Sequence, residues 1–274
     1  MLIPLEDNFE DIIGKAQRGF QLSDEQLADK AGVTIDELGR VRSGQVLEDV
    51  IRRLAAALSL GVQTLVDSAH RAWYPQPHAV EGLARFNTPF EDMLVNAYLL
   101  WDRSQGEGLI FDTGASTVSL LDFVREKALR IRHVLLTHTH RDHVADLKRV
   151  REAIRAPVWV AEQESIPGAR SFVPGQTFSA GGLEVETRLT SGHSRGGVTY
   201  VVSGLATPVA VVGDALFAGS MGGGMVSYAD ALANNRRHIL SLPPETVLCP
   251  GHGPLTSVGE ERAHNPFFPE FQKS

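Results

Sequence analysis

The stretch LLTHTHRDHVAD, residues 135–146, places three histidines and a carboxylate within six positions, directly after an apolar run. These donors are His138, His140, Asp142 and His143. In an extended segment, alternate side chains point to the same side, so His138, His140 and Asp142 could aim at one point. Imidazole and carboxylate groups suit zinc, iron or manganese, so the alternative to a polar turn is a metal site.

Three further candidate ligands share one setting, the end of an apolar run beside a glycine. They are His193 in TSGHSRGG, Asp214 in VAVVGDALF and His252 in VLCPGHGP. Loops at the ends of neighbouring strands could converge at one edge of a sheet and bring these side chains to the first cluster. No cysteine stands among the seven candidates, which argues against a closed structural zinc site.

The elements that must position these residues are strands and helices that alternate from about residue 82. Apolar runs predict strands at 92–102, 108–114, 131–137, 156–161, 183–189, 197–203, 207–214 and 245–251, and amphipathic periodicity predicts helices at 117–129, 144–154 and 229–242. This alternation indicates a layered α/β domain over residues 82–274. The helix predicted at 144–154 would begin beside His143 and hold the histidine-rich loop on a rigid support.

Residues 1–70 predict a small all-α domain of short helices, and residues 71–81, with Pro75 and Pro77, predict a linker. The helices are marked by capping boxes and glycine stops: Ser23 with Gln26, Thr34 with Glu37, and Gly32, Gly44 and Gly61. The stretch LADKAGVTIDELGRVRSG resembles the helix-turn-helix of lambda-repressor-type DNA-binding domains.

Charge disfavours DNA binding by this helical segment. Residues 1–70 hold 12 Asp and Glu against 7 Lys and Arg, and Asp36 and Glu37 stand at the start of the second motif helix. Only Arg40 and Arg42 on that helix could contact DNA, and a surface of the wrong sign gains no affinity from counterion release. We therefore expect residues 1–70 to serve as a structural element, a cap over an active site or a homodimer contact.

From about residue 83 to 270 the chain resembles the metallo-β-lactamase-fold hydrolases, and among them the glyoxalase II group, through GDALFAGS and PGHGPLTSVGEERAHNPF. The resemblance implies an αββα sandwich with two divalent metal ions, zinc expected and iron or manganese as alternatives. It implies one ion held by His138, His140 and His193, a second held by Asp142, His143 and His252, and Asp214 as the bridge between them.

The resemblance also implies hydrolysis of a small thioester, S-lactoylglutathione or a relative, by a hydroxide shared between the metals. Asp142 and Asp214 would then be catalytic, and Asp112 in FDTGAS would orient a ligand histidine, unless it only forms a turn. Candidate substrate contacts are Arg195, Gly222 and Gly223. The alternatives left open are a mononuclear-iron persulfide dioxygenase, a lactone hydrolase and a ligand-sensing DNA-binding regulator.

Composition limits the remaining classes. The net charge of -7 argues against a protein that coats nucleic acid or binds a membrane surface, and the single cysteine, Cys249, excludes an internal disulfide. With no long apolar stretch and no recognisable signal peptide, a cytoplasmic location is expected. Cys249 is predicted to be buried, and surface or packing roles are predicted for His70, His78, His133, His238 and His264.

Overall fold

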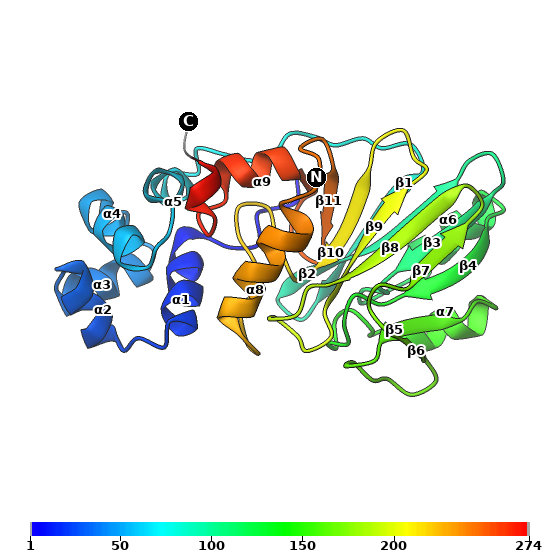
Figure 1. Ribbon diagram of the computed structural model, residues 1–274, viewed down its shortest axis with the longest axis horizontal. Helices are drawn as coiled ribbons and strands as arrows, with labels where there is room; N and C mark the ends of the chain where they lie inside the picture. Colours follow the sequence, from blue (N-terminus) through cyan, green and yellow to red (C-terminus); the bar gives the residue numbers. More distant parts are fainter. Residues whose placement is uncertain (1, 273–274) are drawn as a thin grey trace.

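Two six-stranded sheets pack face to face between layers of helices in the computed structural model, which describes residues 2–272 (Figure 1). The predicted α/β sandwich is therefore confirmed. The first sheet contains, in spatial order, β1 (Leu83–Phe90), β2 (Met93–Asp102), β3 (Glu107–Phe111), β4 (Arg130–Leu135), β5 (Val158–Ala161) and β6 (Arg170–Phe172). The second contains β12 (Thr256–Ser257), β11 (Val247–Pro250), β10 (Val209–Gly213), β9 (Val198–Ser203), β8 (Leu183–Leu189) and β7 (Thr177–Ala180).

The central strands are apolar on both faces because each sheet is covered twice, whereas β7 and β8 alternate buried and exposed residues. In β2, Tyr98 and Leu100 face the opposite sheet, whereas Leu99 faces the outer helices. In β10, Val211 lies between the sheets and Ala210 on the outer side. This alternation of period two explains why the strands read as continuous apolar runs in the sequence.

Helices cover the outer face of each sheet. The first sheet packs on α6 (Val118–Glu126) and α7 (Leu147–Ala153), and the second on α8 (Tyr228–Asn234), the π-helical turn η1 (Asn235–Ile239) and α9 (Val258–His264). A 3₁₀ turn, η2 (Pro269–Phe271), follows α9. Among the described residues, no helix is both long and apolar enough to cross a membrane.

Five short helices precede the sheets: α1 (Phe9–Gly19), α2 (Asp24–Ala31), α3 (Ile35–Arg42), α4 (Glu48–Ala57) and α5 (Val62–Ala69). The capping boxes of Ser23 and Thr34 are present as predicted. Their apolar faces join one cluster with the outer helical layer, in which Ile12 and Leu54 share a core with Val212. Helix α1 lies beside α8 (Figure 1), where Gly19 meets the Tyr228 ring. The N-terminal helices therefore share one apolar cluster with the outer layer of the second sheet.

Several local predictions were wrong. Helix α4 ends at Ala57, and Ser59 after it takes the left-handed conformation. Gly61 is the N-cap of α5 and does not end α4. Helix α7 begins only at Leu147, so His143 lies in a turn before it. The helix predicted at 229–242 forms as α8 and continues as the π-helical turn η1, which ends at Ile239, before the predicted end. No prediction was made for α1, β1, β6, β7, β12 or α9.

A buried carboxylate on α9 holds the loop that follows β10. Glu261 is fully buried and accepts hydrogen bonds from the backbone N–H of Gly219, from Thr256 Oγ1 at 2.7 Å and from Asn265 Nδ2 at 2.7 Å. Asn265 Nδ2 also donates to the carbonyl of Ser220. Residues 219–220 are therefore hydrogen-bonded to α9. These hydrogen bonds fix the backbone just before the glycine-rich segment 222–224.

The buried Glu261 should make stability depend on pH. Burial raises its pKa from 4.5 to about 8, so the folded protein holds this proton more tightly than the unfolded chain. Its contribution to the free energy of unfolding is full below about pH 4.5 and is lost as the pH rises toward 8, by about 1.4 kcal/mol per pKa unit. Glutamine does not titrate, so wild type should lose stability relative to Glu261→Gln between pH 5 and 8 in urea unfolding. A flat difference between wild type and Glu261→Gln would contradict the assignment.

Candidate metal centre

All seven predicted donors lie in loops that follow strands at one edge of the sandwich. Residues 138–143 follow β4, His193 lies between β8 and β9, Asp214 follows β10 directly, and His252 follows β11. Strand β4 ends at Leu135, His138 and His140 lie in the irregular segment after it, and residues 141–143 form a turn that carries Asp142 and His143. Both sheets contribute, so formation of the cluster requires the complete sandwich.

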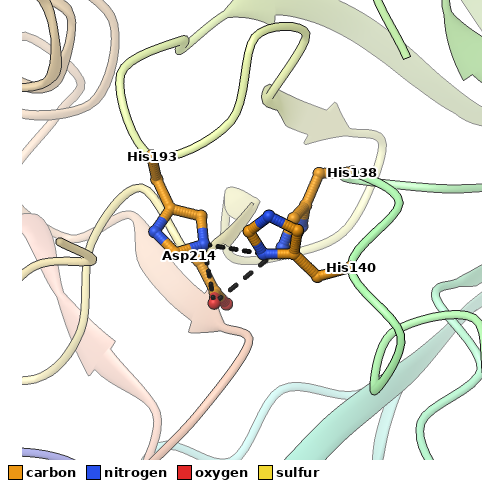
Figure 2. Close-up of side chains that lie close together, drawn as sticks. All are labelled: His138, His140, His193 and Asp214. Atoms are coloured by element: carbon orange, nitrogen blue, oxygen red, sulfur yellow. Dashed lines mark hydrogen bonds and ion pairs between the residues drawn. The ribbon is translucent and has the colours of Figure 1, made fainter. Parts of the chain in front are cut away.

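The first group of donors comprises His138, His140, His193 and Asp214 (Figure 2). His193 Nε2 lies 3.0 Å from His140 Nδ1 and 3.4 Å from Asp214 Oδ2. His138 Nε2 lies 3.9 Å from the same carboxylate oxygen. One donor atom from each residue lies within 4.8 Å of the others, so a single cation could reach all four.

The second group comprises Asp142, His143 and His252. Asp142 Oδ2 lies 3.4 Å from His143 Nε2 and 3.2 Å from His252 Nε2. Asp214 faces this group as well, with Oδ1 3.2 Å from His143 Nε2 and Oδ2 3.5 Å from His252 Nε2. Asp214 therefore lies between the two groups, where a bridging ligand would be needed.

Asp112 controls the orientation of a histidine in each group. Its Oδ2 accepts a hydrogen bond from His143 Nδ1 at 2.8 Å and from the Thr137 hydroxyl at 2.7 Å. Because that hydroxyl already donates to Asp112, it can only accept from His138 Nδ1, 3.0 Å away. The hydrogen-bond network thus assigns the proton to Nδ1 of both histidines and leaves each Nε2 lone pair free for a metal. This is the orienting position predicted for Asp112, which also takes the left-handed turn conformation.

Carbonyl oxygens hold two more histidines in the same way. His193 Nδ1 lies 3.1 Å from the carbonyl of Gly223, and His252 Nδ1 lies 2.7 Å from that of Leu94. Asn96, buried on β2, donates to the carbonyls of Pro250 and Gly253 on either side of His252. These partners come from distant parts of the chain, and the sequence had no local signal for them.

The donor set fits divalent cations. Within residues 2–272, Nε2 of His138, Nε2 of His143 and Oδ1 of Asp214 are buried without a hydrogen-bond partner. Buried polar atoms rarely stay unpaired, and these three are aimed at one another. Burial and the neighbouring His143 also hold the pKa of His138 well below its usual value, which keeps it the neutral base that a metal binds.

The carboxylates of the cluster attract positive charge. Burial lowers the pKa of His143, but Asp214 and Asp112 outweigh this effect and raise it to about 10. Burial is likewise overcome at His252, where Asp214 and Asp142 raise the pKa to about 11. Burial alone would raise the pKa of Asp214, yet the two histidines hold it well below its usual value. Metal ions would supply the positive charge that protons otherwise provide.

A cavity of about 700 Å³ opens over the cluster. Donors from both groups line its floor, and the glycine-rich segment 222–224 lines one wall. Helix α1 and the residues that flank it also line the cavity, through Glu6, Lys15, Arg18, Gly19 and Gln21. Burial raises the pKa of Glu6 to about 7. None of these five residues was predicted as part of the site.

Two glycines are required by close approach to the donors. A Cβ on Gly222 would lie 1.9 Å from the carbonyl oxygen of Asp214 and 2.9 Å from His193 Nδ1. A Cβ on Gly251 would lie 2.1 Å from Asp214 Oδ1. Gly222 was predicted as a substrate contact, and it and Gly223 do line the cavity. A side chain at Gly222 would also collide with the donors, so glycine is required there for a second reason, which only the packing shows.

Arg195 was predicted to contact substrate because it follows His193 so closely. The structure places it at an exposed position outside the residues that line the cavity. The adjacent Gly196 donates its N–H to Glu164, which turns the chain away after His193. Arg195 is therefore not positioned as the anion contact.

The histidines outside the cluster occupy other environments. His78 binds Glu260 at 2.7 Å, His264 stacks on Trp73, and His133 accepts from the Trp159 indole at 3.1 Å. Cys249 is fully buried in the core between the sheets, and burial raises its pKa.

Comparison with known proteins shows which family the sandwich matches. Residues 91–252 match the metallo-beta-lactamase superfamily. The probable metallo-hydrolase YqgX of Bacillus subtilis is 32% identical over 209 residues, which cover 67% of this chain and 96% of the relative. The hydroxyacylglutathione hydrolase GloC of Haemophilus influenzae is 25% identical over 197 residues, which cover 63% of this chain and 92% of that protein.

Solved structures agree with this match. The crystal structure of TTHA1623 in a di-iron-bound form has a TM-score of 0.55 and 29% identity, covering 66% of this chain and 99% of that one. The alignments cover these three proteins almost completely but leave about a third of this chain unmatched. Helices α1–α5 all precede the superfamily match, so they are an addition to the shared sandwich.

Replacement of Asp112 by asparagine should weaken metal binding in both groups. The amide nitrogen would donate where Oδ2 now accepts, which favours the wrong tautomer of His143 and, through Thr137, of His138. Loss of such an orienting partner typically costs about 10–100-fold in metal affinity. Competitive chelator titration of Asp112→Asn would measure this loss of metal affinity. Asp146→Asn is the control, because Asp146 binds Thr117 and Arg149 away from the cluster; equal affinities in both variants would refute the role.

Metal uptake should release protons. The pKa values of about 10 and 11 mean that His143 and His252 are protonated at pH 7 in the metal-free protein. A metal must displace these protons, so binding of Zn²⁺ should release about two per chain, and apparent affinity should rise with pH. Calorimetry in buffers of different ionisation enthalpy counts the protons. A binding enthalpy that is independent of the buffer would contradict this electrostatic description.

Proposed function

The chain belongs to the metallo-beta-lactamase superfamily, and on this premise we propose that it is a metal-dependent hydrolase of a small acyl thioester. S-lactoylglutathione is the first substrate to test. The observation that carries the proposal is Asp214, a buried carboxylate shared by two groups of donors. That arrangement suits two divalent ions, for which zinc is expected and iron or manganese are alternatives.

The substrate class rests on similarity and on the cavity. The relative of H. influenzae is a hydroxyacylglutathione hydrolase, and a cavity of about 700 Å³ is in the size range that accepts a small molecule. The donors His140, Asp142 and His193 line this cavity, so a bound acyl group would meet the metal centre directly.

Two metal ions in this centre would polarise a carbonyl oxygen and lower the pKa of a bound water. The protein residues would position the water and the substrate. Asp142 lines the cavity, and although burial opposes ionisation, the hydrogen bond from His252 keeps its pKa below the usual value. Its carboxylate is therefore ionised at neutral pH, and we assign it the task of accepting a hydrogen bond from water at the cavity floor and so orienting that water. Asp214 would hold the two groups at a fixed separation.

The proposal predicts thioester cleavage by metal-replete protein, detected as release of free thiol from a panel led by S-lactoylglutathione. Asp214→Asn should lose at least about a hundredfold in kcat/KM, because the bridging charge is removed. Asp146→Asn, a carboxylate outside the cavity, should keep wild-type activity. Absence of hydrolysis across the panel would refute the proposal, as would one iron per chain together with oxygen uptake on a persulfide.

A further inference from the structure

Helix α1 brings a cation to the mouth of the active-site cavity. We propose that Arg18 binds an anionic group on the thiol-bearing part of the substrate and so makes this enzyme selective for anionic thioesters. The inference rests on the proposed function and adds a specificity residue from outside the superfamily match, which begins at residue 91. It also gives the N-terminal helices a place in the active site.

The N-terminal segment is fixed against the site by a second cation, Lys15. Its ammonium forms an ion pair with Asp7, donates to the carbonyl of Met221 at 2.9 Å and lies 5.0 Å from the centroid of the Phe217 ring. The Phe217 ring meets the His252 ring edge-on, with 5.7 Å between the ring centroids. Lys15 is thus a positioning residue, and its charge is already compensated by Asp7.

Arg18 differs from Lys15 because its guanidinium has no ion-pair partner among the described residues. Within residues 2–272 its guanidinium forms no ion pair and no hydrogen bond, although it lines the cavity. It lies back along α1 over Gly14, where a Cβ would come within 3.1 Å of Nη1. The absence of a side chain at Gly14 therefore leaves the room in which the guanidinium rests, one helical turn before its own Cα.

The lining segment 225–228 contacts α1 and is partly apolar. The ring of Tyr228 packs against Gly19, where a Cβ would lie 2.3 Å from it, and contacts the Phe20 ring at 5.4 Å. Met225 and Val226 also line the cavity and remain exposed. A substrate in the cavity would therefore meet both apolar side chains and a guanidinium.

The charges of the cavity lining favour an anion at Arg18. Three carboxylates line the cavity: Asp142 and Asp214 face the donor groups, and Glu6 forms no ion pair with Arg18 within residues 2–272. Lys15 is neutralised by Asp7. Arg18 is then the lining cation whose charge no described carboxylate offsets. A guanidinium presents a planar fork of donors that matches carboxylate or phosphate oxygens, so either anion could serve.

The test compares charged and neutral thioesters in two pairs. S-lactoylglutathione is paired with its diethyl ester to probe carboxylates, and acetyl-coenzyme A is paired with acetyl-pantetheine to probe phosphates. Wild type should prefer the charged member of at least one pair. Arg18→Gln should raise KM for that member by about 10–100-fold with kcat little changed, and should leave the neutral member unaffected. Arg40→Gln, exposed on α3, is the matched control and should behave as wild type.

A binding measurement separates this inference from the proposed function. Calorimetry with the unreactive S-methylglutathione and with free coenzyme A should show weaker binding to Arg18→Gln than to wild type for the preferred anion, whether or not any thioester is cleaved. An unchanged KM and unchanged binding in Arg18→Gln would overturn the assignment while hydrolysis itself stands. Circular dichroism checks folding, which an exposed side chain should not disturb.

Discussion

The structure depends on one constraint, the burial of the Asp214 carboxylate among imidazoles. Its oxygens lie 3.2–3.9 Å from histidine nitrogens of both donor groups, and Oδ1 has no hydrogen-bond partner among the described residues. A buried carboxylate in this state is costly unless cations compensate it. Metal binding and folding of this edge of the sandwich are therefore coupled, because the loops that hold the donors are also the loops that would expose Asp214 if they opened.

The sandwich meets this constraint with supports that cross between its sheets. Asp112, at the end of β3, fixes histidines in both donor groups, and Asn96 on β2 holds the loop of His252 from the opposite sheet. Gly222 and Gly251 remove the Cβ atoms that would otherwise strike Asp214. Each support comes from an element whose position is set by packing of the two sheets, so precision at the metal centre is a property of the whole core.

The sequence allowed prediction of what depends on local signals. Capping boxes at Ser23 and Thr34 are contained within four residues, and the seven donors stand out because polar groups directly follow apolar strands. Long-range packing was not readable. Strand β1 is half-buried along its length and contains Pro89, so it has no clear alternation. Arg195 is next but one to His193 in sequence yet is turned outward, whereas Lys15 reaches Met221 across 206 positions.

The N-terminal helices show why resemblance of a segment does not determine its role. Residues 1–70 are acidic overall, yet Lys15 and Arg18 both line the cavity. Helix α1 shares its apolar face with the outer layer of the second sheet, so moving it away would expose a core that the sandwich and the helices build together. A segment fixed in this way can shape a binding site without motion of its own. In our interpretation its acidic surface is therefore of less consequence for function than the two cations that it places over the metal donors.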